Sequence, residues 1–88
     1  MRTEGGISIG NRVRMSDLTE GERALAEEVR SREGMAGRLA AIGLSEGAQI
    51  ECVLRRPSGG IAAYRIRGAL MALRAEDAAL ITVIRAGG

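Results

Sequence analysis

Glycine interrupts this chain at short intervals along most of its length. Of the 88 residues, thirteen are glycine and only one is proline. Glycine adopts backbone conformations that other residues avoid, so a chain this rich in glycine is expected to turn often. The length leaves room for one small domain at the lower end of the usual size range. We therefore expect several short elements joined by turns, and not a large multidomain enzyme.

The apolar residues are almost entirely aliphatic. Hydrophobic residues make up 45% of the chain and charged residues 27%, a balance typical of a globular protein rather than a disordered or membrane-spanning one. The sequence contains no Phe, Trp or His, and Tyr64 is its single aromatic residue. The core must therefore be built from aliphatic side chains, and so small a domain should have modest stability.

The charges and the single cysteine indicate a cytoplasmic protein. All thirteen basic residues are arginine, and eleven acidic residues leave a formal net charge of +2. A dedicated nucleic-acid binder usually has a basic stripe with stacking aromatic residues, and this composition hints only at the basic stripe. Cys52 has no partner for an internal disulfide, which fits a reducing compartment. The sequence shows neither an apolar run that spans a bilayer nor a signal peptide.

The chain is expected to consist of an arm, a domain and a tail. Residues 1–14 contain three glycines and no sustained helical or strand period, which indicates an N-terminal arm that need not be ordered. From Met15 the sequence pattern changes, because apolar residues bracket a polar step and Gly21 closes a turn. We place the compact domain at residues 15–85. Residues 86–88 form the short C-terminal tail.

Residues 22–30 carry two conflicting signals. They are good helix formers, but Gly21 and Gly34 bound a segment of strand length. We interpret the segment as a strand. A bulge in that strand would bring three apolar side chains to one side, those of Ala24, Ala26 and Val29.

Residues 33–44 are expected to contain a short helix. Apolar residues fall at helical spacing on one face, at Met35, Leu39 and Ile42. Gly43 stands where a helix needs a left-handed residue to end, and Leu44 can fold back on the last turn.

A hairpin is expected to follow the helix. In residues 48–56 the apolar positions are Ile50, Cys52 and Leu54, and in residues 61–67 they are Ala62, Tyr64 and Ile66. The intervening Pro-Ser-Gly-Gly sequence is typical of a turn, so the two strands should pair antiparallel.

The remaining residues complete an all-antiparallel sheet. We expect a short strand at residues 69–73, one helical turn at residues 74–78, and a last strand containing Ile81 and Val83. Small antiparallel sheets remove exposed edges by curling closed. The predicted fold is therefore mainly β: a small barrel of five or six short antiparallel strands with one short inserted helix.

No set of residues in the sequence predicts catalysis, a metal site or a cofactor. Cys52 lies on the apolar side of its strand, which indicates a buried structural thiol. With no histidine, Cys-His catalysis and the usual imidazole metal site are excluded. The acidic pairs at 27–28 and 76–77 are interpreted as solvated surface. The glycines lack the pattern of a phosphate-binding loop or a dinucleotide site.

The candidate partner-binding residues are arginines and apolar residues. Paired strands with the predicted alternation would place several guanidinium groups on one outer face, those of Arg55, Arg56, Arg65 and Arg67. The alternative is an ordinary solvated strand face, balanced by Glu51 and other carboxylates. Should that face bind a partner, an acidic protein surface is favoured over RNA because stacking aromatics are absent.

The helix region supplies further candidates. Arg38 adds a charge, and an exposed apolar edge for a partner or a second copy is expected from Ala40, Ala41, Leu44 and Met71. Weak homo-oligomerisation through that edge is therefore a further expectation.

Taken together, the spacings from Met15 to Ile84 resemble the ferrous iron transport protein A (FeoA) family. The resemblance lies in Leu18-x-x-Gly21, Arg38-Leu39-x-x-Ile42-Gly43-Leu44-x-x-Gly47, Arg65-x-Arg67-Gly68, Leu73-Arg74 and Glu76-x-Ala78-x-x-Ile81-x-Val83. The chain departs from the family pattern in the hairpin turn, because residues 56–60 lack the Asp-Pro that family members often carry.

This resemblance implies an SH3-like β-barrel and a non-enzymatic accessory role. The implied partner is the cytoplasmic, GTPase-bearing part of a membrane ferrous iron transporter of the FeoB type, which would also be the only membrane contact. No cofactor and no nucleic acid is implied. Similar domains also occur at the end of metal-dependent transcriptional repressors. The alternative from the residues themselves is a small nucleic-acid-binding or general protein-interaction barrel.

Overall fold

Within residues 11–56 and 58–86, which the computed structural model describes, six short strands form a single sheet. The strands are β1 (Arg12–Arg14), β2 (Arg23–Val29), β3 (Gln49–Arg55), β4 (Ile61–Ile66), β5 (Ala69–Arg74) and β6 (Ile81–Arg85). They are interrupted by the 3-10 turn η1 (Met15–Asp17) and by the helices α2 (Ala36–Ala41) and α3 (Ala75–Ala78).

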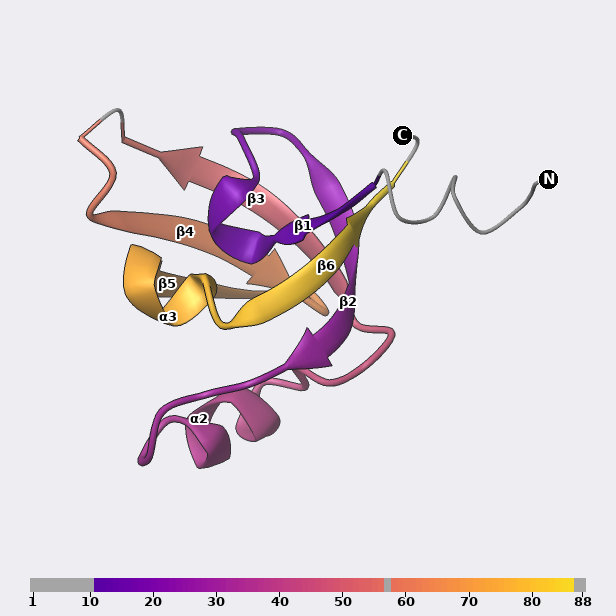
Figure 1. The fold of residues 1–88 in the computed structure, drawn as a ribbon, viewed down its shortest axis with the longest axis vertical. Helices are drawn as coiled ribbons and strands as arrows, with labels where there is room; N and C mark the ends of the chain where they lie inside the picture. Colours follow the sequence, from indigo (N-terminus) through magenta and orange to yellow (C-terminus); the bar gives the residue numbers. More distant parts are fainter. Residues whose placement is uncertain (1–10, 57, 87–88) are drawn as a thin grey trace, which may run out of the picture.

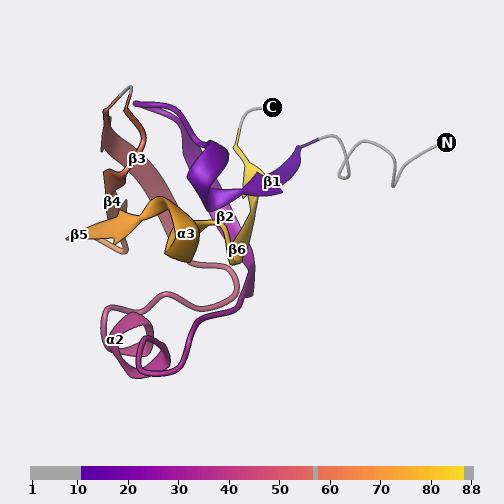
Figure 2. The same ribbon diagram turned by 60° about the vertical axis from the view of Figure 1, so that its left-hand side comes forward.

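The sheet places strands that are distant in the sequence side by side. Its order is β1-β6-β2-β3-β4-β5, and every neighbouring pair is antiparallel. Figures 1 and 2 show the sheet curling so that β3, β4 and β5 face β1, β6 and β2, with α3 between the two halves. The prediction of a mainly β fold with five or six short antiparallel strands and one short inserted helix is confirmed.

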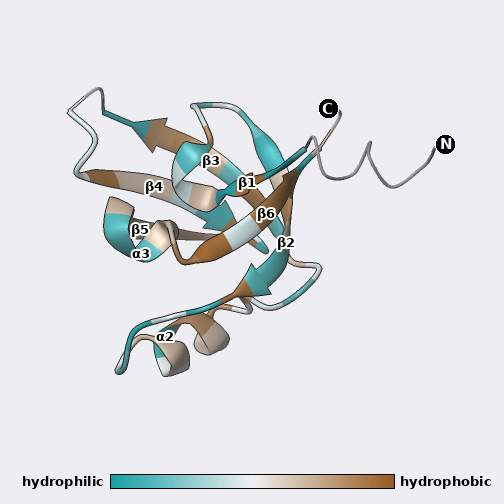
Figure 3. Ribbon diagram, viewed as in Figure 1, coloured by the Kyte–Doolittle hydropathy of each residue, from teal (hydrophilic) through white to brown (hydrophobic). Residues whose placement is uncertain are grey.

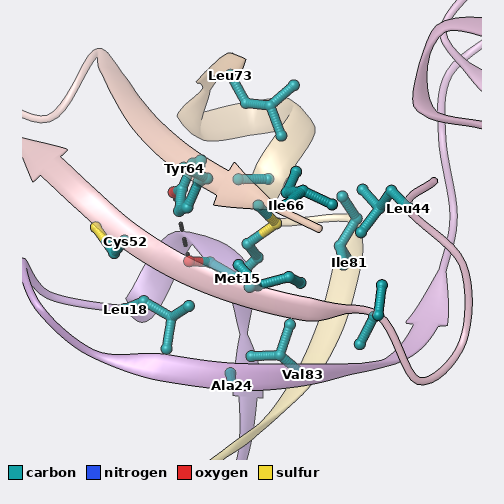
Figure 4. Close-up of a cluster of buried hydrophobic side chains, with 14 of the residues drawn as sticks. Met15, Leu18, Ala24, Leu44, Cys52, Tyr64, Ile66, Leu73, Ile81 and Val83 are labelled. Atoms are coloured by element: carbon teal, nitrogen blue, oxygen red, sulfur yellow. Dashed lines mark hydrogen bonds between the residues drawn. The ribbon is translucent and has the colours of Figure 1, made fainter. Parts of the chain in front are cut away.

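The curled sheet encloses an aliphatic core around one aromatic ring. Tyr64 is 1% exposed and lies among buried aliphatic side chains from η1 and every strand except β1. Its hydroxyl donates a hydrogen bond of 3.4 Å to the carbonyl of Met15, drawn in Figure 4. Burial raises the pKa of Tyr64 to about 12. Strand β6, which lies between β1 and β2, is hydrophobic over most of its length, as Figure 3 shows.

A bulge in β2 confirms the interpretation of residues 22–30 as a strand. The register with β6 shifts between Ala26 and Glu28, which leaves Glu27 as the extra residue. Ala26 lies opposite Val83, and Val29 lies opposite Ile81. Since both partners are fully buried, the bulge returns Val29 to the side that packs on the core.

A second bulge, in β3, corrects the prediction for Leu54. The register with β4 shifts between Cys52 and Leu54. Cys52 lies opposite Tyr64 and faces the core, but Leu54 lies opposite Ala63 on the outer side and is 49% exposed. One extra residue in a strand reverses the side to which every later residue points. Simple alternation therefore placed Leu54 on the wrong face.

The whole of β1 belongs to the span that the sequence assigned to an arm. Arg12–Arg14 pairs antiparallel with β6, with Val13 opposite Val83. The prediction of an arm is therefore wrong at these residues, because β6 supplies the hydrogen-bonding partner that the local sequence does not reveal. Residues 1–10 lie outside the described part of the chain, and the remaining domain boundaries stay predictions.

Helix α2 lies below the curled sheet in Figure 1, between β2 and β3 along the chain. Its predicted apolar face is confirmed, with Leu39 buried and Met35 and Ile42 packed against the core. Gly43 ends the helix at a φ of +85°, and the Leu44 amide donates to the Leu39 carbonyl at 2.9 Å.

Leu44 itself is not at an exposed edge. It is 3% exposed and belongs to the core, because the chain folds back after Gly43. The expectation that Leu44 contributes to a docking edge is therefore wrong.

None of the helices in the described ranges has the length and hydrophobicity of a segment that crosses a bilayer.

Candidate interaction surface

The outer face of the sheet carries a row of charged side chains from neighbouring strands. Arg23 of β2 lies opposite Glu51 of β3, Glu51 lies opposite Arg65 of β4, and Arg65 lies opposite Leu70 of β5. Residues directly opposite each other in a sheet have neighbouring side chains. The register therefore places one arginine on each side of a single glutamate.

A groove opens on this face beside the charged row. It has a volume of about 460 Å³. Its lining residues come from β2, β3, β4 and the following loop and strand ends: Arg23, Ala24, Leu25, Gln49, Ile50, Glu51, Arg65, Arg67, Gly68 and Ala86. We call this site the arginine groove. It offers cationic and amide groups next to apolar surface.

The arginines of the groove differ in how they are held. Arg65 donates from Nη1 to Oε1 of Glu51 at 2.9 Å, which fixes that pair on the outer face. Arg67 donates from Nε to the carbonyl of Gly43 at 2.8 Å, so its side chain lies across the end of α2. Arg23 is exposed and makes no side-chain hydrogen bond or ion pair within residues 11–56 and 58–86.

The backbone at Arg67 adds strain to this arrangement. Arg67 has a φ of +49°, a left-handed value that residues with a side chain rarely adopt. Gly68 follows with a φ of +87° and completes the tight turn between β4 and β5. The turn thereby directs Arg67 both to the groove and to the end of α2.

The structure separates the four arginines predicted to share one outer face. Arg65 and Arg67 line the groove. Arg55 lies opposite Ala62, which is buried, and its guanidinium donates from Nη1 to the carbonyl of Leu18 at 2.8 Å. The bulge in β3 turns Arg55 toward the core side, so its predicted place on the outer face is wrong. Arg56 is exposed near the hairpin turn, away from the groove lining.

The candidates near the helix also lie outside the groove lining. Arg38 is exposed on α2 and contacts the sulfur of Met35 at 3.6 Å. Met71 is half-buried against the core, and only Ala40 and Ala41 of the expected apolar edge are exposed. Their role in partner binding stays a prediction.

Sequence reasoning missed three residues that shape this face. Arg23, Leu25 and Leu70 are exposed, and each lies on a strand whose alternate residues are oriented inward. The signal was present in β2, because Ala24 and Ala26 were expected inside, which leaves Arg23 and Leu25 outside. Their neighbours across the sheet depend on register, which the alternation of one strand does not specify.

The potentially reactive groups are either buried or paired. Cys52 is fully buried, as expected for a structural thiol, and burial raises the pKa of this thiol. The carboxylates considered for a cation form ion pairs with arginine instead: Glu27 with Arg12, Glu28 with Arg30, and both Glu76 and Asp77 with Arg32. Asp77 is buried, so its interpretation as solvated surface is wrong. Across the described ranges, no three His, Cys, Asp or Glu residues are grouped so as to hold a metal ion.

The fold and this face define a small SH3-like β-barrel protein with an arginine-lined groove on its outer surface. A sequence model of the FeoA domain matches residues 6–85. This chain belongs to the FeoA domain family, so the resemblance found in the sequence is confirmed. No curated protein matches the chain at a significant level.

Solved structures agree with this assignment. FeoA from Chlorobium tepidum has a TM-score of 0.79 at 29% identity, over 86% of this chain and 72% of that one. Iron(II) transport protein A from Clostridium thermocellum has a TM-score of 0.78 at 28% identity, over 86% of this chain and 47% of that one. A zinc complex of Stenotrophomonas maltophilia FeoA, described as a procaryotic SH3 domain protein, has a TM-score of 0.70 at 25% identity, over 81% and 88% of the chains.

Proposed function

We propose that this protein is a non-enzymatic accessory protein of ferrous iron transport. In this role it binds the cytoplasmic, GTPase-bearing part of a FeoB-type membrane iron transporter. The observation that carries the proposal is the FeoA domain match over residues 6–85. The Stenotrophomonas maltophilia relative is described as a candidate activating factor for bacterial ferrous iron transport, which supports the same role here.

The arginine groove supports a binding role rather than a chemical one. Its polar side chains are arginine, glutamine and glutamate, and Glu51 is engaged by Arg65. General acid-base or nucleophilic catalysis needs a positioned nucleophile next to a base. The sequence has no histidine, and its single thiol is buried. The proposed location is the cytoplasm, which is also where such a partner domain is found.

The test is a titration of the labelled protein with the purified cytoplasmic domain of the transporter. We expect amide chemical shifts to move at the groove, at Leu25, Gln49 and Gly68, and to move little in the core strand β6. The titration is run with and without guanine nucleotide, because a GTPase domain changes conformation with its nucleotide. If no shift occurs in either state at high concentration, the proposed partner is wrong.

A further inference from the structure

We propose that the arginine groove binds an acidic segment of the partner protein. In the complex, carboxylates of that segment pair with Arg23 and Arg67, and an apolar side chain packs on Leu25. This inference rests on the proposed function, since it specifies the chemistry of the partner at the same surface.

The lining of this groove carries a net positive charge. Its lining contains three arginines and one glutamate, an excess of two positive charges that equals the formal net charge of the whole chain. Elsewhere, carboxylates neutralise several arginines in ion pairs: Arg12–Glu27, Arg30–Glu28, Arg32–Asp77 and Arg85–Glu22. A negatively charged ligand is therefore attracted to the groove more than to these neutralised regions.

Two arginines of the groove have no carboxylate partner within residues 11–56 and 58–86, and both are placed to receive one. Arg23 is exposed, and Arg67 uses its Nε for the Gly43 carbonyl, which leaves its two terminal nitrogens without a hydrogen bond within the described ranges. Guanidinium groups bind carboxylates through two parallel hydrogen bonds, and such charge-assisted bonds are stronger than neutral ones. Because Glu51 is already held by Arg65 at 2.9 Å, its repulsion of an incoming carboxylate is reduced.

The apolar surface beside these arginines favours a peptide that carries apolar side chains as well as carboxylates. Leu25 lines the groove and is 44% exposed, and Leu70, opposite Arg65 at the next strand, is 65% exposed. An interface commonly combines an apolar centre with a polar rim, and Leu25 beside the arginines supplies apolar area that a partner side chain can cover. A segment with leucine or isoleucine between glutamates or aspartates fits both features.

The same observations disfavour other occupants. Proteins that bind single-stranded nucleic acid stack bases on aromatic side chains, and the single aromatic residue of the chain, Tyr64, is 1% exposed. A second copy of this chain would bring another surface of net positive charge to the groove, and like charges across an interface oppose association.

The experiment measures binding of a short synthetic peptide that alternates glutamate with leucine. The control peptide has glutamine in place of every glutamate. We expect the acidic peptide to shift the amides of Leu25, Gln49 and Gly68, and to bind at least tenfold more tightly than the control peptide. Equal affinity for the two peptides overturns the proposal, because carboxylates would then contribute nothing.

Two matched variants separate a local effect from the effect of net charge. Arg23→Gln removes an exposed arginine inside the groove, and Arg74→Gln removes an exposed arginine of β5 outside it. We expect R23Q to weaken peptide binding at least fivefold and R74Q to weaken it less than twofold. Equal weakening contradicts the proposal, since it would show only attraction to the overall charge. Unfolding curves confirm that both variants fold.

Two further measurements test the other occupants. Tighter binding of a single-stranded oligonucleotide than of the acidic peptide, with a steep loss as salt rises, would overturn the choice of a protein partner. Self-association that R23Q abolishes would show that a second copy occupies the groove, and would also overturn it. We expect neither result.

The outcome also distinguishes this inference from the proposed function. If the transporter domain binds and R23Q leaves its affinity unchanged, the accessory role stands and the groove assignment fails. If the acidic peptide binds and the transporter domain does not, the groove assignment stands and the proposed partner fails.

Discussion

The two faces of the β3–β4 hairpin differ sharply although their residues alternate along the same strands. On the inner face, Ile50, Cys52, Tyr64 and Ile66 are almost completely buried. On the outer face, Glu51 and Arg65 form an ion pair that remains accessible to water. Burial of apolar area stabilises the fold, whereas surface ion pairs contribute little. The inner face therefore determines stability, and the outer face is free to determine what the protein binds.

The largest expected effect contrasts two adjacent residues of β4. Ile66→Ala removes a fully buried side chain and should lower the free energy of unfolding by roughly 2–5 kcal/mol, because a cavity remains. Arg65→Ala should lower it by less than about 1 kcal/mol, as expected for an exposed ion pair. Urea unfolding followed by circular dichroism measures both. Similar losses for the two variants would contradict the division between the faces.

The pH dependence of stability tests the burial of Tyr64 on the inner face without a substitution that leaves a cavity. Burial raises the pKa of Tyr64 from its ordinary value of 10 to about 12, so the folded state retains the proton longer than the unfolded state. The contribution of Tyr64 to stability is therefore fully present below pH 10 and is lost as the pH rises toward 12, by up to roughly 3 kcal/mol. Unfolding by urea at a series of alkaline pH values measures this decline.

Tyr64→Phe is the control for the alkaline decline, because it removes the titrating hydroxyl. Burial also raises the pKa of Cys52 above its ordinary value of 9, so a loss of stability above pH 9 that comes from this thiol remains in the variant. Identical pH profiles for Tyr64→Phe and the natural sequence would show that Tyr64 does not cause the decline.

A smaller effect concerns the contact between the groove and α2. Gly43 and Gly47 have the same φ of +85°, but a Cβ on Gly43 would lie 2.7 Å from Cδ of Arg67, whereas nothing lies within 4 Å at Gly47. Gly47→Ala should cost about 1–2 kcal/mol for the left-handed backbone alone. Gly43→Ala should cost about 1 kcal/mol more, since Arg67 must move and lose its hydrogen bond.

Urea unfolding of the two glycine variants provides the comparison, and the NMR signal of the Arg67 Nε–H reports on its hydrogen bond. We expect that signal to shift in Gly43→Ala and to stay in place in Gly47→Ala. An equal loss of stability in both variants, with an unmoved signal, would show that Arg67 does not contact the end of α2.

The smallest effect is expected at Leu54, which the bulge in β3 turns outward. Leu54→Ala should change the free energy of unfolding by no more than about 0.5 kcal/mol, because the side chain is already half exposed. Leu44→Ala is the matched control, a leucine that is buried in the core. Thermal unfolding of the two variants ranks their stabilities. A larger loss of stability for Leu54→Ala than for Leu44→Ala would contradict the outward orientation of Leu54 that the bulge produces.

The sequence predicted the elements better than it predicted which residues meet. The strand at residues 22–30, its bulge and the apolar face of α2 follow from local spacing, because burial imposes a period of two on strands and about 3.6 on helices. Alternation alone failed at Leu54 and Arg55, since one extra residue at Val53 reverses the faces. The expectation of an exposed Leu44 was wrong for another reason: the fold-back after Gly43 was predicted, but the core that buries this side chain is assembled from distant strands.

The candidate site was less predictable than the fold. Arg65 and Arg67 were identified because they alternate with buried residues of β4. Arg23 and Leu25 were missed, since they become their neighbours only through pairing of β2 with β3. β1 escaped detection for the same reason, because its three residues form a strand only beside β6.

The sequence by itself determined an aliphatic, mainly β protein of the FeoA family, because hydrophobic spacing and glycine positions act over a few residues. Only the tertiary structure decided where the positive charge gathers. Arg23 lies more than forty residues before Arg65 and Arg67 in the chain, and strand register brings the two segments to one groove. Register is a property of the folded sheet as a whole, since it is set by the bulges and the closure of the core together.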